Sequence, residues 1–321
     1  MNNINESIVL VGGGGGVYRV ARYLKEIRAN ITTIQTMFDS GGHSRKLRDE
    51  RGMLPPGDIR QAILALSDNS IEESLRVLLS HRFSVRNGSS IDNATLGNLM
   101  LTALTEHYGS IVVAINELCK LARVKGKVLP VSLDNAHLAV TLSDGSELVG
   151  EGLIDTRNVK DRRTIVGAYL KPQADIYVEA LDALIKADKI VFCPGDLYTS
   201  IIPNTLVNGF KEAIAESEAQ LIYAVNIMTK KAETHDFKAS MFAKTLLSYL
   251  GRETFDAVIV NSRHISSAVR ARYHREHSYP VRVDKRELRK YAKQVILHPL
   301  VDLTGDIVRH NASIASLIAH L

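Results

Sequence analysis

The sequence predicts an α/β fold in which helices cover both faces of a mainly parallel β-sheet. Two observations carry this prediction. An apolar run at 8–11, five consecutive glycines at 12–16 and a helical pattern at 17–27 indicate a strand, a tight loop and a helix. From residue 175 onward, helical patterns alternate with short apolar runs, which is typical of a parallel sheet covered on both faces.

The first half of the chain continues this pattern. A run rich in β-branched residues predicts a second strand at 31–38. The dense charge run at 45–51 is typical of a solvated helix face. A rigid Pro-Pro-Gly turn then precedes a series of predicted helices, at 59–66, 71–79, 94–108 and 110–124.

A β-rich stretch follows at about 126–170. Short strands are expected at 127–131, 137–142 and 148–149, with a hairpin turn at 143–146. The stretch is shorter than most independent domains, so we interpret it as an insertion within a single domain of residues 1–321.

The second half supplies the alternating elements. Helices are expected at 175–187, 204–217, 236–250 and 307–321, and strands at 189–193, 221–225, 257–260 and 294–297.

Composition narrows the class of protein. The 321 residues are 45% hydrophobic, which is enough to bury a sizeable core. A net charge of +5 favours an anionic ligand but is too small to indicate nucleic-acid binding. The two cysteines have no metal or disulfide spacing and indicate a reducing compartment. No signal peptide or membrane insertion is expected, so the sequence predicts a cytoplasmic protein.

The glycine run predicts a cradle for phosphate. Glycines expose backbone N–H groups, and the following helix presents unpaired N–H groups and the positive end of its dipole. A tight turn without a ligand is the alternative. The dinucleotide fingerprint fails, because Val17 or Tyr18 stands where its last glycine belongs. The P-loop pattern also fails, because no lysine occurs before Lys25.

Three predicted loops converge at the carboxyl edge of the sheet, where doubly wound folds bind ligands. They are Gly12–Gly16, Asp39–Ser44 and Pro194–Asn204. The hydroxyl and amide groups of the third loop either cap a helix or bind phosphate and sugar oxygens. Asp58 has the same two alternatives, and Arg60 is a candidate anion contact.

Several motifs in register resemble one family. They are the glycine loop after Val11, segments 38–48 and 54–60, Gly97-Asn98, segment 194–204 and segment 226–234. Together they resemble the CofD-like superfamily, specifically its YvcK branch of gluconeogenesis factors. The match runs from about residue 7 to at least 262, and the last sixty residues carry no assignable motif.

The resemblance implies a Rossmann-like three-layer α/β/α fold and a nucleotide diphosphate ligand. Members of this branch are similar to binders of UDP-sugars, notably UDP-N-acetylglucosamine. They act during growth on gluconeogenic carbon and in the maintenance of cell shape. The CofD branch instead transfers a 2-phospho-L-lactyl group from a guanosine diphosphate carrier to a deazaflavin precursor with Mg²⁺. That branch lacks the Leu-Pro-Pro-Gly-Asp segment found at 54–58.

This chain departs from the family pattern at several positions. The family usually has Thr at Gly15, a second Asp at Ser40, and Ser and Gly at His43 and Arg45. It has Ser at Asp196, and Gln-Pro-Gly where this chain has Lys230-Lys231-Ala232. Because this chain has an added carboxylate and added cations, a ligand that differs from the family's is an alternative.

The motifs favour binding and regulation over catalysis. They contain no Ser–His–Asp or Cys–His arrangement, no activated acceptor is evident, and Cys193 is expected in the core. Asp39 and Asp196 are the candidate Mg²⁺ ligands, because Mg²⁺ at a diphosphate commonly uses one or two carboxylates. With Mg²⁺ bound, the site would have the parts for transfer at a diphosphate. The catalytic residues, if there are any, stay unassigned.

Partners follow from the same observations. We expect a small-molecule nucleotide ligand and a homo-oligomer, without nucleic acid. The basic stretch 270–293 is interpreted first as a solvated face and second as a docking surface for a regulatory protein. Patterns and resemblance together give the candidate ligand-binding residues, Gly12, Gly13, Gly14, Gly15, Gly16, Asp39, Ser40, Gly41, Asp58, Arg60, Asn98, Gly195, Tyr198, Thr199, Ser200, Asn204 and Asn226.

Overall fold

A seven-stranded parallel sheet forms the centre of the protein. The structure is a computed structural model that describes residues 6–28, 30–40, 54–84, 91–158, 161–302 and 307–321. The strand order is β10-β9-β8-β7-β1-β2-β3. The strands are β1 (Ile8–Gly12), β2 (Ile31–Gln35), β3 (Lys127–Pro130), β7 (Lys189–Phe192), β8 (Gln220–Ala224), β9 (Phe255–Asn261) and β10 (Ala292–His298).

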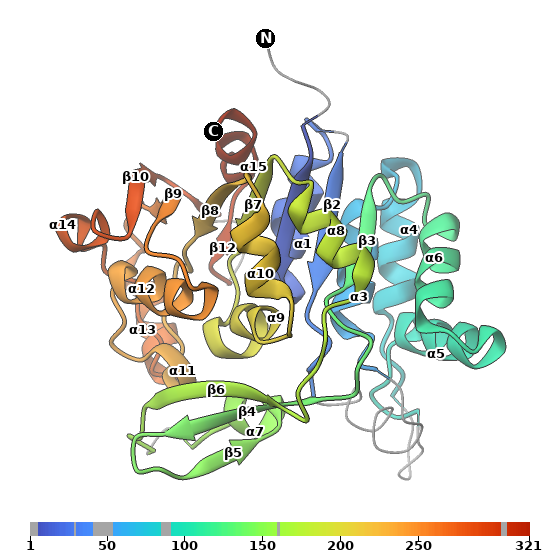
Figure 1. The fold of residues 1–321 in the computed structure, drawn as a ribbon, viewed down its shortest axis with the longest axis horizontal. Coiled ribbons are helices and arrows are strands. Elements are labelled where there is room, and N and C mark those ends of the chain that lie inside the picture. Colours follow the sequence, from blue (N-terminus) through green and yellow to red (C-terminus); the bar gives the residue numbers. More distant parts are fainter. Residues whose placement is uncertain (1–5, 29, 41–53, 85–90, 159–160, 303–306) are drawn as a thin grey trace.

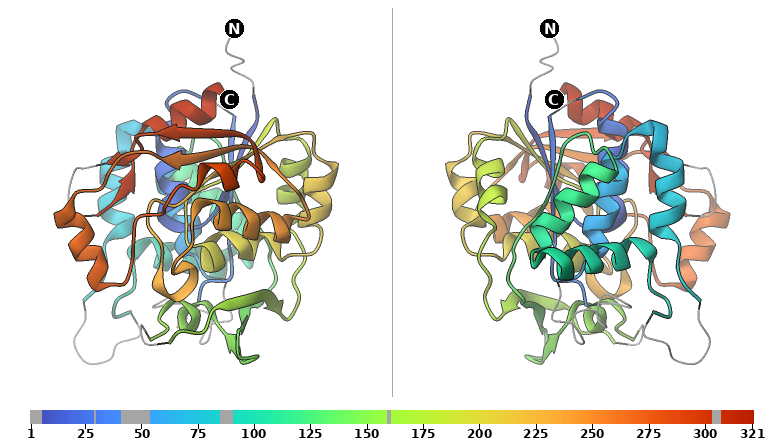
Figure 2. Two further views of the ribbon diagram at one scale, coloured as in Figure 1. Left: turned by 90° about the vertical axis from the view of Figure 1, so that its left-hand side faces the viewer. Right: turned by 90° about the vertical axis from the view of Figure 1, so that its right-hand side faces the viewer.

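Helices cover both faces of this sheet (Figures 1 and 2). One face packs against α1 (Gly14–Leu24), α3 (Gly57–Leu66), α4 (Asn69–Ser80), α5 (Leu96–Tyr108), α6 (Ile111–Leu121) and α15 (Ser313–His320). The other packs against α8 (Val178–Ile185), the π-helix η1 (Leu197–Ile201), α9 (Ile202–Thr205), α10 (Phe210–Glu216) and α12 (Ala239–Leu250). The predicted three-layer α/β fold is therefore confirmed.

The apolar character of β1 follows from its central position. Val9 and Val11 belong to the core on one face, and Ile8 and Leu10 belong to the core on the other. Alternate residues of a strand point to opposite faces, so a strand buried on both faces is apolar throughout. This is why an unbroken apolar run predicted the strand correctly.

The chain reverses its direction of travel across the sheet at β1. It proceeds from β1 to β2 and β3 on one side, then returns to β7 and continues through β8, β9 and β10 on the other. The neighbouring strands β1 and β7 therefore mark a topological switch point, and doubly wound folds bind ligands at the carboxyl ends of the strands there. The glycine loop after β1 and the loop after β7 flank this point.

A small antiparallel sheet covers the carboxyl ends of the strands (Figure 1). It has the order β5-β4-β6, with β4 (His137–Leu142), β5 (Glu147–Val149) and β6 (Ile165–Lys171). The short helix α7 (Glu151–Asp155) lies between β5 and β6 in the chain. The predicted hairpin between β4 and β5 is confirmed. Strand 127–131 was wrongly placed in this insertion, because β3 pairs with β2 in the main sheet. The sequence reading also missed β6.

Several predicted boundaries were wrong. The second strand ends at Gln35 rather than at 38, and the first helix spans Gly14–Leu24 rather than 17–27. The helix expected at 204–217 is broken into α9 and α10, because Gly209 adopts a left-handed φ of 89° between them. The helix expected at 307–321 begins only at Ser313.

Shorter elements complete the second half. They are α11 (Lys231–Thr234), α13 (Ser267–Arg275), α14 (Lys285–Leu288), β11 (Val301–Asp302) and β12 (Arg309–His310). None of the α13 residues is buried, which agrees with a solvated face for the first part of the basic stretch. Further along this stretch, Leu288 and Ala292 are buried. Among the described residues, no helix combines the length and apolar character that a membrane span requires.

Candidate functional site

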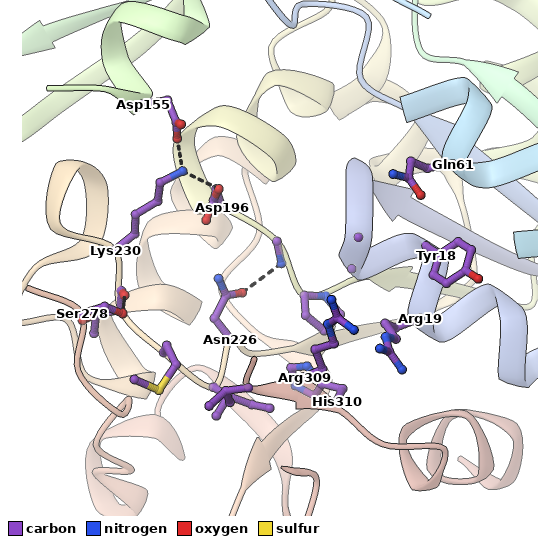
Figure 3. Close-up of a pocket in the computed structure, with 18 of the residues that line it drawn as sticks. Tyr18, Arg19, Gln61, Asp155, Asp196, Asn226, Lys230, Ser278, Arg309 and His310 are labelled. Carbon is purple, nitrogen blue, oxygen red and sulfur yellow. Dashed lines mark hydrogen bonds and ion pairs between the residues drawn. The ribbon is translucent and has the colours of Figure 1, made fainter. Parts of the chain in front are cut away.

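A cavity of about 790 Å³ lies at the switch point (Figure 3). The start of α1 and the loops after β7 and β8 form part of its wall, and residues of α3, α4, α7, α11, α13 and β12 also line it. Its volume lies within the range of about 300–1,000 Å³ that is usual for small-molecule sites. Figure 3 shows Lys230, Asp155 and Asp196 on one side of the cavity and Tyr18, Arg19 and Gln61 on the other.

The charge of the cavity wall favours an anion. The wall carries three carboxylates, Asp155, Asp196 and Glu276. It carries seven cationic side chains, Arg19, Arg22, Arg76, Arg157, Lys230, Lys231 and Arg309. A concave surface with an excess of one charge concentrates ligands of the opposite charge.

The last three glycines of the run begin α1, whereas Gly12 ends β1 and Gly13 is the N-cap of the helix. Gly14 has a left-handed φ of 56°, which glycine adopts without a steric cost. Gly16 lies so close to the loop after β7 that a Cβ atom there would stand 1.4 Å from the Pro194 carbonyl oxygen. Gly15 and Gly16 line the cavity, whereas Gly12, Gly13 and Gly14 do not. Only part of the predicted cradle therefore faces the cavity.

The side chain of Asp58, a residue of α3, lies against the amino end of α1. It lies inside α3, whose N-cap is Pro56, so the predicted capping of its own helix is wrong. Its carboxylate instead accepts a hydrogen bond from the Gly14 N–H. Burial and the nearby Asp39 carboxylate raise the pKa of Asp58 to about 7, against the opposing effects of the Gly14 N–H and Arg60.

This raised pKa predicts a pH-dependent stability. Between 3.8 and about 7 the folded Asp58 keeps a proton that the unfolded chain loses. The free energy of unfolding is therefore expected to fall as the pH rises through this window, by up to about 1.4 kcal/mol per pH unit from this group. Asp58→Asn keeps an acceptor for the Gly14 N–H and removes the titration, so urea unfolding should show a shallower decline in the variant. Equal slopes in both proteins would contradict this assignment.

Glu233 and Asn226 accept hydrogen bonds from the segment that follows β7. The Gly195 N–H donates to Asn226 Oδ1 at 3.0 Å. The Tyr198 N–H and the Thr199 hydroxyl both donate to the fully buried Glu233 carboxylate, each at 2.7 Å. Tyr198 and Thr199, which were predicted to bind the ligand, therefore anchor η1 to Glu233. Gly195 and Asn226 do line the cavity.

Asn204 and Ser200 also have internal roles. Asn204 donates to the Ser200 carbonyl oxygen at 2.9 Å and to the Gly12 carbonyl oxygen at 3.4 Å. It therefore ties the loop after β7 to the end of β1. Neither Ser200 nor Asn204 is among the residues that line the cavity.

Arg60 and Asn98 pair with each other. Arg60 is buried, and its Nε donates to Asn98 Oδ1 at 3.1 Å. Its guanidinium also reaches the Leu79 carbonyl oxygen and the Ser80 hydroxyl, each at 3.5 Å. These contacts join α3, α4 and α5, and neither residue lines the cavity.

The two predicted Mg²⁺ ligands lie in different acidic groups. Asp39 lies beside Asp58 and Glu151, and burial and Asp39 raise the pKa of Glu151 well above its ordinary value. Ser40 beside it accepts a hydrogen bond from the Gly152 N–H at 3.1 Å. Gly41, His43, Arg45 and the charge run 45–51 lie outside the described residues.

Asp196 belongs to the second acidic group, with Asp155 and Glu233. Ligand oxygens of these three residues lie within 4.8 Å of one another. Lys230 forms ion pairs with Asp155, with Asp196 at 2.5 Å and with Glu233 at 3.6 Å. Burial and the Glu233 carboxylate raise the pKa of the Asp196 carboxyl.

The sequence reading missed much of the cavity wall. Asp155 and Arg157 come from the insertion, and Arg309 and His310 come from the last sixty residues, where no motif had been found. No local pattern marks these residues, since only the fold brings them together. Cys193 is fully buried, and burial raises the pKa of its thiol, in agreement with the predicted core position.

Comparisons with known proteins agree with one another. The family model described as "2-phospho-L-lactate transferase CofD" matches residues 8–301. The chain is 38% identical over 309 residues to the "Gluconeogenesis factor" of Halalkalibacterium halodurans, covering 96% of this chain and 94% of the relative. It is 36% identical to the "Gluconeogenesis factor" of Bacillus subtilis, covering 98% and 97%. A crystal structure of a Bacillus halodurans protein matches with a TM-score of 0.89 and 36% identity, covering 98% and 99%.

Proposed function

The chain belongs to the CofD family, in its gluconeogenesis-factor branch, and on this premise we propose that it is a nucleotide-diphosphate-sugar-binding protein. Its ligand is a UDP-sugar of the UDP-N-acetylglucosamine kind. It acts in the cytoplasm as a regulator of central carbon metabolism and cell shape, without turnover of the ligand.

The observation that carries this proposal is the cationic cavity at the switch point. The amino end of α1 reaches the cavity through Gly15 and Gly16, and seven cationic side chains line the same wall. A diphosphate carries the negative charge that such a wall attracts, and helix amino ends bind phosphate through backbone N–H groups. The cavity has room for a nucleotide portion beside the diphosphate.

We expect UDP-sugars to stabilise the folded protein. A ligand that binds only the folded state adds about 2.7 kcal/mol at a hundredfold excess over its Kd, which raises the melting midpoint of a domain of this size by several degrees. The measurement is a thermal-shift panel of UDP-sugars, GDP, NAD and NADP, each with and without Mg²⁺. UDP-sugars should give the largest shifts and nicotinamide cofactors the smallest. No shift with any nucleotide at millimolar concentration would refute the proposal.

A substitution at Gly15 tests where the ligand binds. A Cβ at Gly15 would meet nothing within 4 Å, and Gly15 lines the cavity. We therefore expect the fold to accept valine there and its side chain to take up space beside the helix N–H groups. Gly15→Val should therefore melt like the parent when unliganded and lose the nucleotide shift. Gly15→Ala, which adds one methyl group, should retain most of the shift. An undiminished shift in Gly15→Val would place the ligand elsewhere.

A transferase of the CofD kind is the second candidate, because the matching family model is described as such an enzyme. It would transfer a 2-phospho-L-lactyl group from a guanosine diphosphate carrier to a deazaflavin precursor. Incubation with both substrates and Mg²⁺, followed by mass spectrometry, distinguishes the two functions. Product above the blank would favour the transferase, and turnover of UDP-N-acetylglucosamine itself would contradict a purely regulatory role.

A further inference from the structure

Three carboxylates and one ammonium group meet at one end of the cavity. Asp155 comes from α7 of the insertion, Asp196 from the loop after β7, and Glu233 from α11. Their oxygens lie close enough together to hold a single cation. The Lys230 ammonium already forms ion pairs with all three (Figure 3 shows those with Asp155 and Asp196).

A divalent cation does not fit this group as it stands. Mg²⁺ requires near-octahedral oxygen ligands at about 2.0–2.1 Å. Here Asp196 Oδ2 accepts a hydrogen bond from Lys230 at 2.5 Å, and Asp155 accepts another from the same ammonium. Both Glu233 oxygens accept hydrogen bonds from η1. Binding Mg²⁺ would therefore displace Lys230 and leave its ammonium, without its partners, beside a dication.

We propose that the Lys230 ammonium permanently takes the place of a divalent cation at Asp155, Asp196 and Glu233. The chain then supplies its own cation at this end of the cavity, one ammonium shared by three carboxylates, and no metal is bound there. The inference does not depend on which nucleotide the protein binds, because it concerns a cation position that can be probed without nucleotide.

The chemistry of lysine suits this position. An ammonium group has three N–H donors and can serve several carboxylates at once. The same contacts connect the insertion to the main fold, since Asp155 and Asp196 belong to α7 and to the loop after β7.

Mn²⁺ binding, followed by electron paramagnetic resonance, tests the proposal. Lys230→Gln removes the ammonium and keeps a side chain of similar length, so this variant should bind one more equivalent of Mn²⁺ than the parent. Adding Asp196→Asn to Lys230→Gln should abolish the extra equivalent. Lys231→Gln is the matched control, because it removes the same charge from the same cavity wall and should leave the stoichiometry of the parent unchanged.

Three results would overturn the proposal. The first is that folded Lys230→Gln binds as many equivalents of Mn²⁺ as the parent. The second is that Lys231→Gln gains the same extra equivalent as Lys230→Gln. The third is that the single variant Asp196→Asn binds one equivalent of Mn²⁺ fewer than the parent. The last comparison does not involve Lys230→Gln, so it decides the question even where that variant fails to fold. In it, equal Mn²⁺ binding by the parent and Asp196→Asn supports the proposal. The change in melting midpoint on adding nucleotide is a separate measurement, so either proposal can fail without the other.

Discussion

Gly16→Ala is expected to lose about 3 kcal/mol or more of the free energy of unfolding. The added Cβ would stand 1.4 Å from the carbonyl oxygen of Pro194 and 2.5 Å from its carbonyl carbon. Both are backbone atoms, so relief requires α1 and the loop after β7 to move apart. Total stabilities of natural domains are about 5–15 kcal/mol, and much of the population would therefore unfold at moderate temperature.

The neighbouring residue provides a control of opposite sign. A Cβ at Gly15 would meet no atom within 4 Å, and Gly15 is the second residue of α1. Alanine should therefore gain part of the ~0.5–1 kcal/mol by which it is favoured over glycine in a helix interior. Urea unfolding followed by circular dichroism should therefore show a small gain for Gly15→Ala and a large loss for Gly16→Ala. Similar stabilities for the two variants would show that α1 does not pack against Pro194 in this way.

Glu233→Ala is expected to cost about 3–5 kcal/mol, the usual result of removing one partner from a buried charged network. The carboxylate is fully buried and accepts hydrogen bonds from Tyr198 and Thr199 while pairing with Lys230. Its removal leaves two buried donors without an acceptor, and η1 loses its support. Thermal and urea unfolding measure the loss.

The control for this variant is an exposed glutamate. Glu253→Ala should change the stability by no more than about 0.5 kcal/mol, because Glu253 lies on the surface. Glu233→Gln should fall between the two, since it keeps an acceptor for one donor but not the charge. A loss in Glu233→Ala as small as that in Glu253→Ala would contradict the supporting role of the network.

The fold was predictable because its signals are local. The runs at 8–11 and 189–193 are apolar because β1 and β7 are buried on both faces, and this burial is visible in sequence as an unbroken hydrophobic stretch. The prediction that the loops after the first two strands and the loop at 194 meet at one edge is confirmed for the described residues, because β1 lies between β2 and β7.

The candidate site was predictable only in part, because its side chains meet through tertiary contacts. A helix start was not expected within the glycines, since glycine disfavours helices, yet the close approach of Gly16 to Pro194 requires glycine there. Similarly, Asp196 and Lys230 were recognised separately as departures from the family pattern. The structure shows that these two departures contact each other, which no reading of either segment alone could reveal.

The pairing of β1 has a consequence for the order in which the chain is made. Ile8 lies beside Lys189 in the sheet, so the central strand gains its second neighbour only after that residue is synthesised. At about 5–20 residues per second, translation leaves this edge of β1 open for about 10–40 s. An unpaired apolar strand edge is a template for pairing with other chains. Products released from the ribosome before β7 is complete should therefore aggregate rather than accumulate as a folded amino-terminal half.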